Sequence, residues 1–200
     1  LFSLSCAQSN KSFILIDLRD GKPPQLNPFQ AANEHELYEL LSSALSLGRK
    51  GEAADHYRNI DRKALRVLTK NKPKSIRELV SSAPQLLESE LFKNSQGLLD
   101  QLEELASVSS IQTLENDNLM QRIIDNGGCL YIIGSTRNEA TLMLQKMLFI
   151  RLVQLVEKRD RGGRHITVFA DEIKYLLSAP LINALGTVRD KGMNILLAHQ

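Results

Sequence analysis

The chain has 200 residues, of which 42% are hydrophobic and 24% charged, and its formal net charge is +2. This composition is ordinary for a folded protein with one substantial core; it excludes a disordered chain, and the small charge indicates no class of partner. No apolar run reaches the roughly 18 residues of a membrane helix. The two distant cysteines, Cys6 and Cys129, are typical of reduced thiols in a cytosolic protein.

The first predicted elements are a helix end at residues 1–7 and a buried strand at 13–16 that ends at Asp17. The chain does not begin with Met, so we expect it to be a piece of a longer protein. A missing membrane segment is then no evidence that the longer protein lacks one.

Residues 33–125 contain no convincing strand and show helical patterns instead. Asn33 with Glu36 and Ser75 with Glu78 each have the spacing of a capping box, which predicts two helix starts. Further helical periodicities lie at about 53–69, 98–106 and 119–124. We therefore predict an all-α domain at 33–126, inserted between a first part of an α/β core at 1–32 and a second part at 127–200.

The second part of the core alternates strands with helices. Apolar runs predict strands at 129–133, 166–170 and 194–198, and helical patterns fill 138–158 and 181–189. Strands that alternate with helices of ten or more residues indicate a parallel sheet with helices on its faces. The predicted fold class is therefore α/β.

Charge is unevenly distributed within the helical stretch. Basic residues gather in its first half, and the candidates for contact with DNA or a partner protein are Arg58, Arg62, Lys63, Arg66 and Lys70. The other interpretation is a solvated face that docks on a neighbouring subunit or on the acidic stretch that follows.

The strongest local motif is the strand 166–170 that ends in Asp171-Glu172. Ligands of open α/β sheets bind at the carboxyl ends of strands. At that edge the first acid can hold Mg²⁺ and the second can orient and deprotonate an attacking water, as a Walker B element does. The alternative is a strand that ends at two solvated acids.

Downstream residues make this interpretation more specific. A helix carries Arg189, and the next strand ends near Gln200. In nucleotide-driven motors, an arginine can reach the nucleotide of the adjacent subunit and stabilise transition-state charge. A polar residue at a strand end can sense the γ-phosphate. The alternatives are a surface salt bridge for Arg189 and no role for Gln200.

Three segments resemble the TraD/TraG-type conjugative coupling proteins, the ATPases that deliver DNA to type IV secretion systems. They are 171–177, 185–192 and 195–200, and the stretches 128–137 and 26–29 are similar as well. The resemblance covers most of the chain, is most specific at 171–200 and is weakest in the helical stretch. It implies part of a RecA-like parallel sheet, a P-loop NTPase core, with an inserted all-α domain.

The resemblance also implies roles for individual residues. Asp171 would be the Walker B acid at the Mg²⁺ site, Glu172 the catalytic base, Arg189 the inter-subunit arginine finger and Gln200 the sensor of ATP. Asp17 would support the nucleotide site. The implied partners are DNA, relaxosome proteins, the type IV secretion channel and five further copies in a hexameric ring, although a fragment could be monomeric. The implied location is the cytoplasmic face of the bacterial inner membrane, with this piece itself soluble.

One departure from the family pattern is large. The phosphate loop, Gly-x-x-x-x-Gly-Lys-Ser/Thr, is absent from these 200 residues, and we expect it upstream of Leu1. We therefore predict that this chain alone neither binds ATP tightly nor hydrolyses it. Two other functions remain open: an ATPase that assembles a pilus or secretion channel, and a module without catalytic activity that docks relaxosome or channel proteins.

Overall fold

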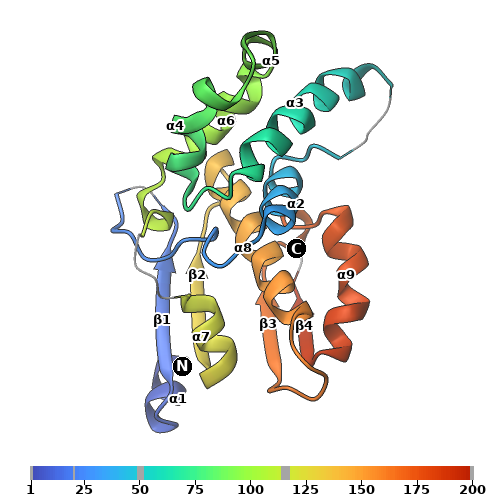
Figure 1. Cartoon of the computed structure of the whole chain (residues 1–200). Coiled ribbons are helices and arrows are strands. Elements are labelled where there is room, and N and C mark those ends of the chain that lie inside the picture. Colours follow the sequence, from blue (N-terminus) through green and yellow to red (C-terminus); the bar gives the residue numbers. More distant parts are fainter. Residues whose placement is uncertain (1, 20, 49–51, 114–117, 199–200) are drawn as a thin grey trace.

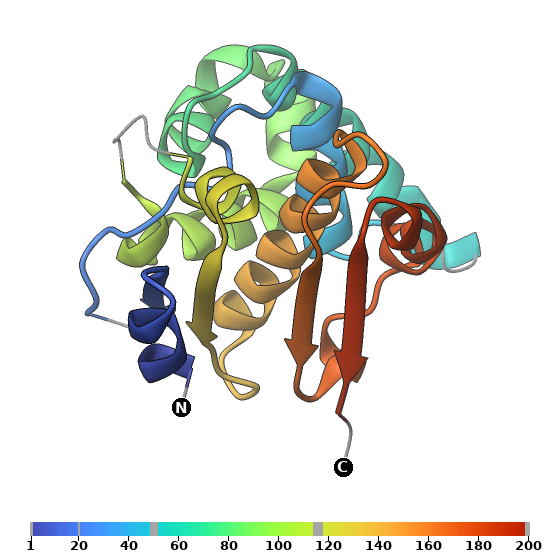
Figure 2. The same cartoon turned by 90° about the horizontal axis from the view of Figure 1, so that it is seen from below.

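The computed structural model describes residues 2–19, 21–48, 52–113 and 118–198. Its strands pair in parallel twos, β1 (Ser12–Asp17) with β2 (Gly128–Ile133) and β3 (Ile166–Ala170) with β4 (Met193–Leu197). The arrowheads of β2, β3 and β4 point the same way in Figure 2, so the carboxyl ends of the strands share one edge. The predicted α/β fold with parallel strands is confirmed.

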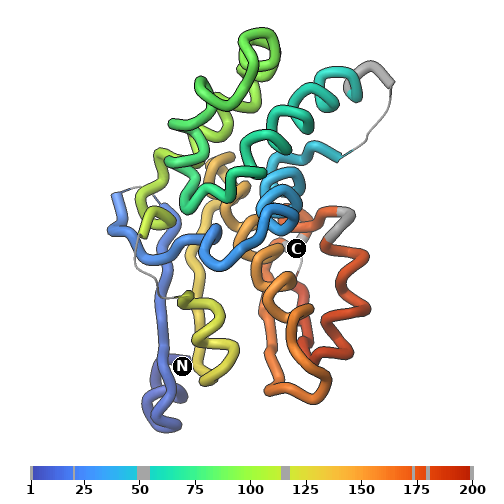
Figure 3. Tube along the Cα trace, in the orientation of Figure 1, coloured from blue at the N-terminus to red at the C-terminus, as the bar shows by residue number. Residues whose placement is uncertain are grey.

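Helices occupy the rest of the described chain. Their order is α1 (Phe2–Gln8), α2 (Glu34–Ala44), α3 (Glu52–Lys70), α4 (Ile76–Leu86), α5 (Ser89–Asn94), α6 (Gln96–Ser107), α7 (Leu119–Asn126), α8 (Glu139–Glu157) and α9 (Ala179–Asp190), with short 3₁₀ turns at Ser109–Ile111 and Ile173–Tyr175. As predicted, the described residues between β1 and β2 form helices and no strand. Figures 1 and 3 show α3 to α6 lying beyond the carboxyl ends of the strands.

Side-chain caps explain several helix starts. Asn33 accepts a hydrogen bond from the Glu36 amide and Glu36 accepts one from the Asn33 amide, which is the predicted capping box of α2. Ser75 caps α4 by accepting from the Glu78 amide. Asn138 caps α8, which begins one residue into the helical pattern predicted for 138–158. The amide oxygen of Asn138 reaches the Thr141 N–H at 2.8 Å.

One face of the strands is covered by helices. Ile14 and Ile16 of β1, Ile132 of β2 and Val168 of β3 pack into the hydrophobic core, which also contains most of α8. Many residues of α8 are buried because α2, α6 and α9 all pack against it. The result is one continuous core that joins the strands to the helical stretch.

The opposite face is much more open. Side chains that alternate with the buried ones remain exposed, with fractions of 46% for Leu15, 48% for Tyr131, 65% for Phe169 and 52% for Leu196. In the described chain only α1 lies on this side, where the Phe2 and Phe169 rings are 6.0 Å apart. Parallel sheets normally bury both faces, so this apolar face is unusual for a parallel sheet.

A charged network fastens α2 to α8. Arg151 is only 2% exposed; its guanidinium lies 3.6 Å from Glu36 and donates to the Gln30 carbonyl at 2.8 Å. Gln154 donates to the Glu36 carbonyl and to the Glu39 carboxylate. Lys158 completes the network, 2.6 Å from Glu36. The helical stretch is therefore anchored to the core by polar as well as apolar contacts.

Candidate nucleotide site at the carboxyl edge

The predicted acids lie where β3 ends. The Asp171 side chain is exposed, and its Oδ1 accepts a hydrogen bond from the Glu172 amide at 3.0 Å. Within the described residues no cation pairs with Asp171, so its charge is available to a ligand. The pairing of β4 with β3 extends to the residue after β4, because Ala198 N donates to Ala170 O at 3.0 Å. Gln200, the predicted sensor, lies outside the described residues.

Glu172 has a distinctive backbone conformation. Its φ of 50° falls in the left-handed region, which is uncommon for a non-glycine residue and concentrates at functional sites. Its carboxylate is 3.4 Å from Lys174 Nζ, and that ammonium lies 5.0 Å from the centre of the Tyr175 ring. Glu172 is therefore a carboxylate held by an adjacent cation on a strained turn.

Asp17 at the end of β1 is already saturated with donors. Arg19 donates to both carboxylate oxygens at 2.8 and 2.7 Å, and Lys22 Nζ lies 3.5 Å away. The hydrogen bonds from the Arg19 guanidinium hold the pKa of the Asp17 carboxyl well below its usual range. Gln25 fixes the same turn by accepting from Asp17 N and donating to Leu15 O. This geometry favours a supporting role for Asp17 in shaping the edge.

Arg189 lies at the opposite edge. It occupies the last turn of α9, and Gly192 N donates to its carbonyl just before β4 begins. Gly192 O in turn accepts from Ile166 N at the start of β3. A five-residue strand, about 16 Å long, therefore separates Arg189 from the Asp171 edge of the same chain. The structure brings Asp171 and Glu172 together and keeps Arg189 away from them.

The donor set fits a magnesium–nucleotide only in part. Mg²⁺ is commonly held by one or two carboxylates together with phosphate oxygens and water, and the exposed Asp171 suits that arrangement. Across the described ranges, no group of three or more His, Cys, Asp or Glu side chains gathers as an all-protein metal site. Phosphates would need cradling groups other than the residues described at this edge, because the 200 residues contain no phosphate loop.

Known proteins match this chain in sequence and in fold. It is 35% identical over 190 residues to Mobilization protein A of Escherichia coli, a match that covers 94% of this chain and 36% of that protein. It superposes with a TM-score of 0.70 on the unbound bacterial conjugative coupling protein TrwBdeltaN70, at 18% identity, covering 92% of this chain and 50% of that one. The chain has the fold of the conjugative coupling proteins. The predicted resemblance is thereby confirmed.

A second coupling-protein structure is informative about ligands. Plasmid coupling protein TrwB in complex with ADP and Mg²⁺ has a TM-score of 0.70 and 18% identity, over 92% of this chain and 51% of that chain.

No protein-family model matches the chain. The chain thus spans about a third of Mobilization protein A and about half of the TrwB chains. No helix in the described ranges has both the length and the apolar character needed to cross a membrane.

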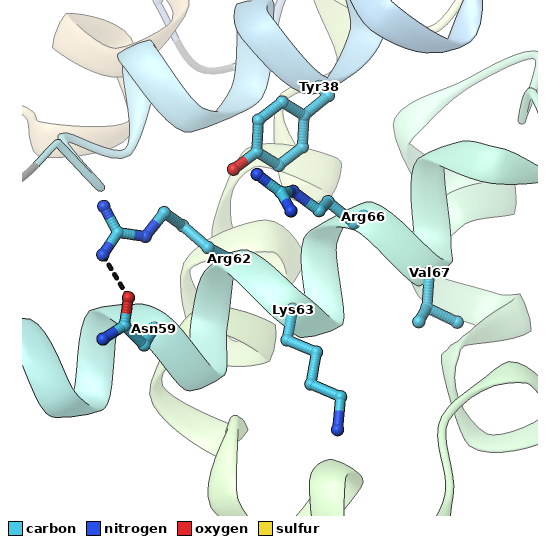
Figure 4. Close-up of a pocket in the computed structure, with 6 residues that line it drawn as sticks. All are labelled: Tyr38, Asn59, Arg62, Lys63, Arg66 and Val67. Atoms are coloured by element: carbon cyan, nitrogen blue, oxygen red, sulfur yellow. Dashed lines mark hydrogen bonds between the residues drawn. The ribbon is translucent and has the colours of Figure 1, made fainter.

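Sequence reasoning missed one feature of the structure. Tyr38 of α2 faces the basic residues of α3 and lines a cavity with Asn59, Arg62, Lys63, Arg66 and Val67 (Figure 4). Tyr38 lies between apolar positions of a predicted helix, so the sequence pattern around it does not predict its contact with the basic residues of α3. Of the predicted basic residues, the cavity brings together Arg62, Lys63 and Arg66, whereas Arg58 and Lys70 do not line it.

Proposed function

We propose that this chain forms part of the motor of a conjugative coupling protein that uses ATP and Mg²⁺ to move DNA into a type IV secretion channel. The observation that carries the proposal is an Asp171-Glu172 pair at a strand end of the coupling-protein fold, with Asp171 exposed and Glu172 half-buried beside Lys174. A relative named for mobilization and a TrwB complex with ADP and Mg²⁺ support the same activity.

Each proposed role follows from charge and position. Asp171 offers an unpaired carboxylate to Mg²⁺, and Glu172 accepts a proton from water once Lys174 releases its carboxylate. Arg189 serves a neighbouring subunit, since it cannot reach its own acids. Gln200 senses the nucleotide, and Asp17 stabilises the conformation of the carboxyl edge by binding Arg19. ATP hydrolysis supplies the free energy for movement when nucleotide and Mg²⁺ are bound.

The same proposal assigns the domains. Residues 1–32 and 127–200 form the RecA-like core, and 33–126 form an inserted all-α domain that contacts DNA through Arg58, Arg62, Lys63, Arg66 and Lys70. The whole protein works as a homohexamer at the cytoplasmic face of the inner membrane, together with relaxosome and channel proteins. A DNA motor is favoured over a pilus-assembly ATPase because both the sequence relative and the fold relatives are named for conjugation or mobilization.

The test uses Glu172→Gln in the full-length protein. We expect plasmid transfer between cells and DNA-stimulated ATP hydrolysis both to fall at least about 100-fold, because a general base contributes roughly 10²–10⁴ in rate. The matched control is Glu139→Gln, an exposed acid in the first turn of α8. Normal transfer by Glu172→Gln would refute the catalytic assignment. ATP hydrolysis that drives the assembly of protein subunits and is not needed for DNA transfer would favour the assembly ATPase.

A separate test addresses the 200-residue chain alone. We expect no measurable ATP hydrolysis and only weak ATP binding, because phosphates lack a cradle of backbone N–H groups and a lysine. An ATPase rate well above background that Glu172→Gln abolishes would contradict this expectation.

A further inference from the structure

A half-open cavity with a mostly basic lining lies between α2 and α3. Its volume is about 560 Å³, within the range of small-molecule pockets. Tyr38 closes it from α2, and Asn59, Arg62 and Arg66 line it from α3. Helix α3, which supplies most of this lining, lies beyond the carboxyl ends of the strands (Figure 1).

Positive charge in this cavity is not neutralised by carboxylates. Arg62 donates to the Leu47 carbonyl at 3.2 Å and to the Asn59 amide oxygen, which are neutral acceptors. In the described part of the chain no carboxylate pairs with Arg62, Lys63 or Arg66. Hydrogen bonds to neutral groups hold the Arg62 guanidinium in place while its charge stays available to an anion.

These cations belong to a longer row. Arg58, Arg62, Arg66 and Lys70 follow one another at intervals of four residues on α3. Residues four apart lie on the same face of a helix, about 6 Å from one to the next. A row of charges at regular intervals, which turns by about 40° around the helix at each step, suits a linear polyanion better than it suits a single phosphate.

The cavity also offers a flat surface. The Arg66 guanidinium carbon lies 5.2 Å from the centre of the Tyr38 ring, and Figure 4 shows the guanidinium beside that ring. Both groups are planar, the guanidinium lies over the ring, and both line the cavity. Exposed nucleic-acid bases stack on aromatic rings and on arginine planes.

We propose that the α2–α3 cavity is a binding site for single-stranded DNA. A base stacks on the Tyr38–Arg66 layer, and the phosphates on either side bind Arg62, Lys63 and the adjoining basic row. Duplex DNA hides its base faces within the stack, so stacking on Tyr38 and Arg66 contributes to binding of a single strand alone. The choice of DNA over RNA rests on the proposed function, whereas the stacking and phosphate contacts do not.

The experiment measures fluorescence anisotropy of a labelled oligothymidylate of about 20 nucleotides, longer than the roughly 4–16 nucleotides of single-strand sites, with the 200-residue chain. At about 0.1 M salt we expect the double variant Arg62→Ala/Arg66→Ala to bind at least about tenfold more weakly. Its affinity should also fall less steeply with added salt, by about 0.7 in the log–log slope for each phosphate that the variant no longer neutralises. Arg161→Ala removes one exposed charge in the α8–β3 connection and should change the affinity less than about twofold.

Substitutions of Tyr38 isolate the stacking contribution. We expect Tyr38→Leu to weaken oligothymidylate binding about tenfold and leave binding to a blunt duplex of equal length unchanged, whereas Tyr38→Phe keeps the ring and the affinity. Circular dichroism and thermal unfolding verify that each variant is folded. Equal losses for single strand and duplex, or a full effect of Arg161→Ala, would reduce the site to non-specific electrostatic attraction and overturn the proposal.

Two further outcomes also decide the question. Binding of an acidic protein partner that these variants abolish, without any affinity for oligothymidylate, would overturn the proposal in favour of a protein interface. Normal plasmid transfer by a full-length Tyr38→Leu protein, when Glu172→Gln abolishes transfer, would refute the single-strand site and leave the proposed motor function standing. If the chain binds single-stranded DNA as expected but the Glu172→Gln protein still transfers the plasmid normally, the single-strand site would stand and the proposed motor function would be refuted.

Discussion

Arg151 gives the most direct test of how the helical stretch is joined to the core. Its guanidinium is almost completely buried, and Arg151→Met keeps the length and apolar volume of the side chain while removing the charge. The substitution removes the hydrogen bonds to the Gln30 carbonyl and the Gln154 side chain and takes one cation away from Glu36. The perturbation is therefore polar rather than one of packing.

The expected cost follows from what is left behind. Removing one member of a buried ion pair costs about 3–5 kcal/mol, because the remaining charge stays buried. Here Glu36 keeps Lys158 at 2.6 Å and the Asn33 amide, so we expect the lower end, about 3 kcal/mol. The control Arg161→Met changes an exposed arginine and should stay within about 0.5 kcal/mol. Urea unfolding followed by circular dichroism measures both.

Acidification tests the same ion pair independently. Burial alone would raise the pKa of Glu36, but the Lys158 hydrogen bond, the Asn33 amide and the Arg151 charge together lower it. A depressed carboxyl pKa stabilises the fold above the unfolded value of about 4.3 and loses that contribution as pH falls below it. Arg151→Met should therefore lose less stability than the wild type between about pH 6 and pH 3. An Arg151→Met protein within about 1 kcal/mol of wild type, with unchanged acid sensitivity, would refute the argument.

Three further experiments test the fold. Gly128→Ala should destabilise the fold by about 2 kcal/mol or more, because φ is +138° and the added carbon would lie 2.6 Å from Ser12 O. Gly186→Ala, where the added carbon meets open space within α9, should instead stabilise the fold by up to about 1 kcal/mol. Denaturant midpoints compare the two variants. Leu102→Ala, at a fully buried position of α6, should cost about 3 kcal/mol in the same assay, and a cost under about 1 kcal/mol would show that the site collapses around the missing side chain. The double variant Phe169→Thr/Leu196→Thr should lower the fluorescence of a bound hydrophobic dye with little loss of stability, because both side chains are exposed and the two residues are directly paired across β3 and β4. Unchanged fluorescence would mean that the dye binds elsewhere.

Local signals in the sequence were sufficient for most elements. The Asn33–Glu36 and Ser75–Glu78 spacings located two helix starts because capping is a contact within one turn. Apolar runs located the strands within a residue, since a buried parallel strand needs a continuous run. The helical pattern predicted from residue 138 begins one residue later in the structure, because Asn138 is the N-cap of α8.

Long-range contacts could not be predicted in the same way. The pairing of Glu36 with Arg151 joins residues more than one hundred positions apart, and the Tyr38–Arg66 layer depends on how α2 packs on α3. Each partner by itself looks like an ordinary helical residue. The position of the acids after β3 could be predicted because it depends only on where the strand ends, whereas the hydrogen bonds from Arg19 to Asp17 depend on the geometry of the turn.

The positions of Arg189 and Glu172 lead to a prediction about assembly. They lie at opposite ends of the β3–β4 pair, so one chain cannot bring both to the same nucleotide. If Arg189 acts across a subunit boundary, Arg189→Ala and Glu172→Gln impair different halves of each shared site. Mixed full-length hexamers of the two variants should then recover part of the ATPase rate, because some boundaries pair an intact Glu172 with an intact Arg189. Mixtures with no more activity than either variant alone would show that Arg189 does not act between subunits.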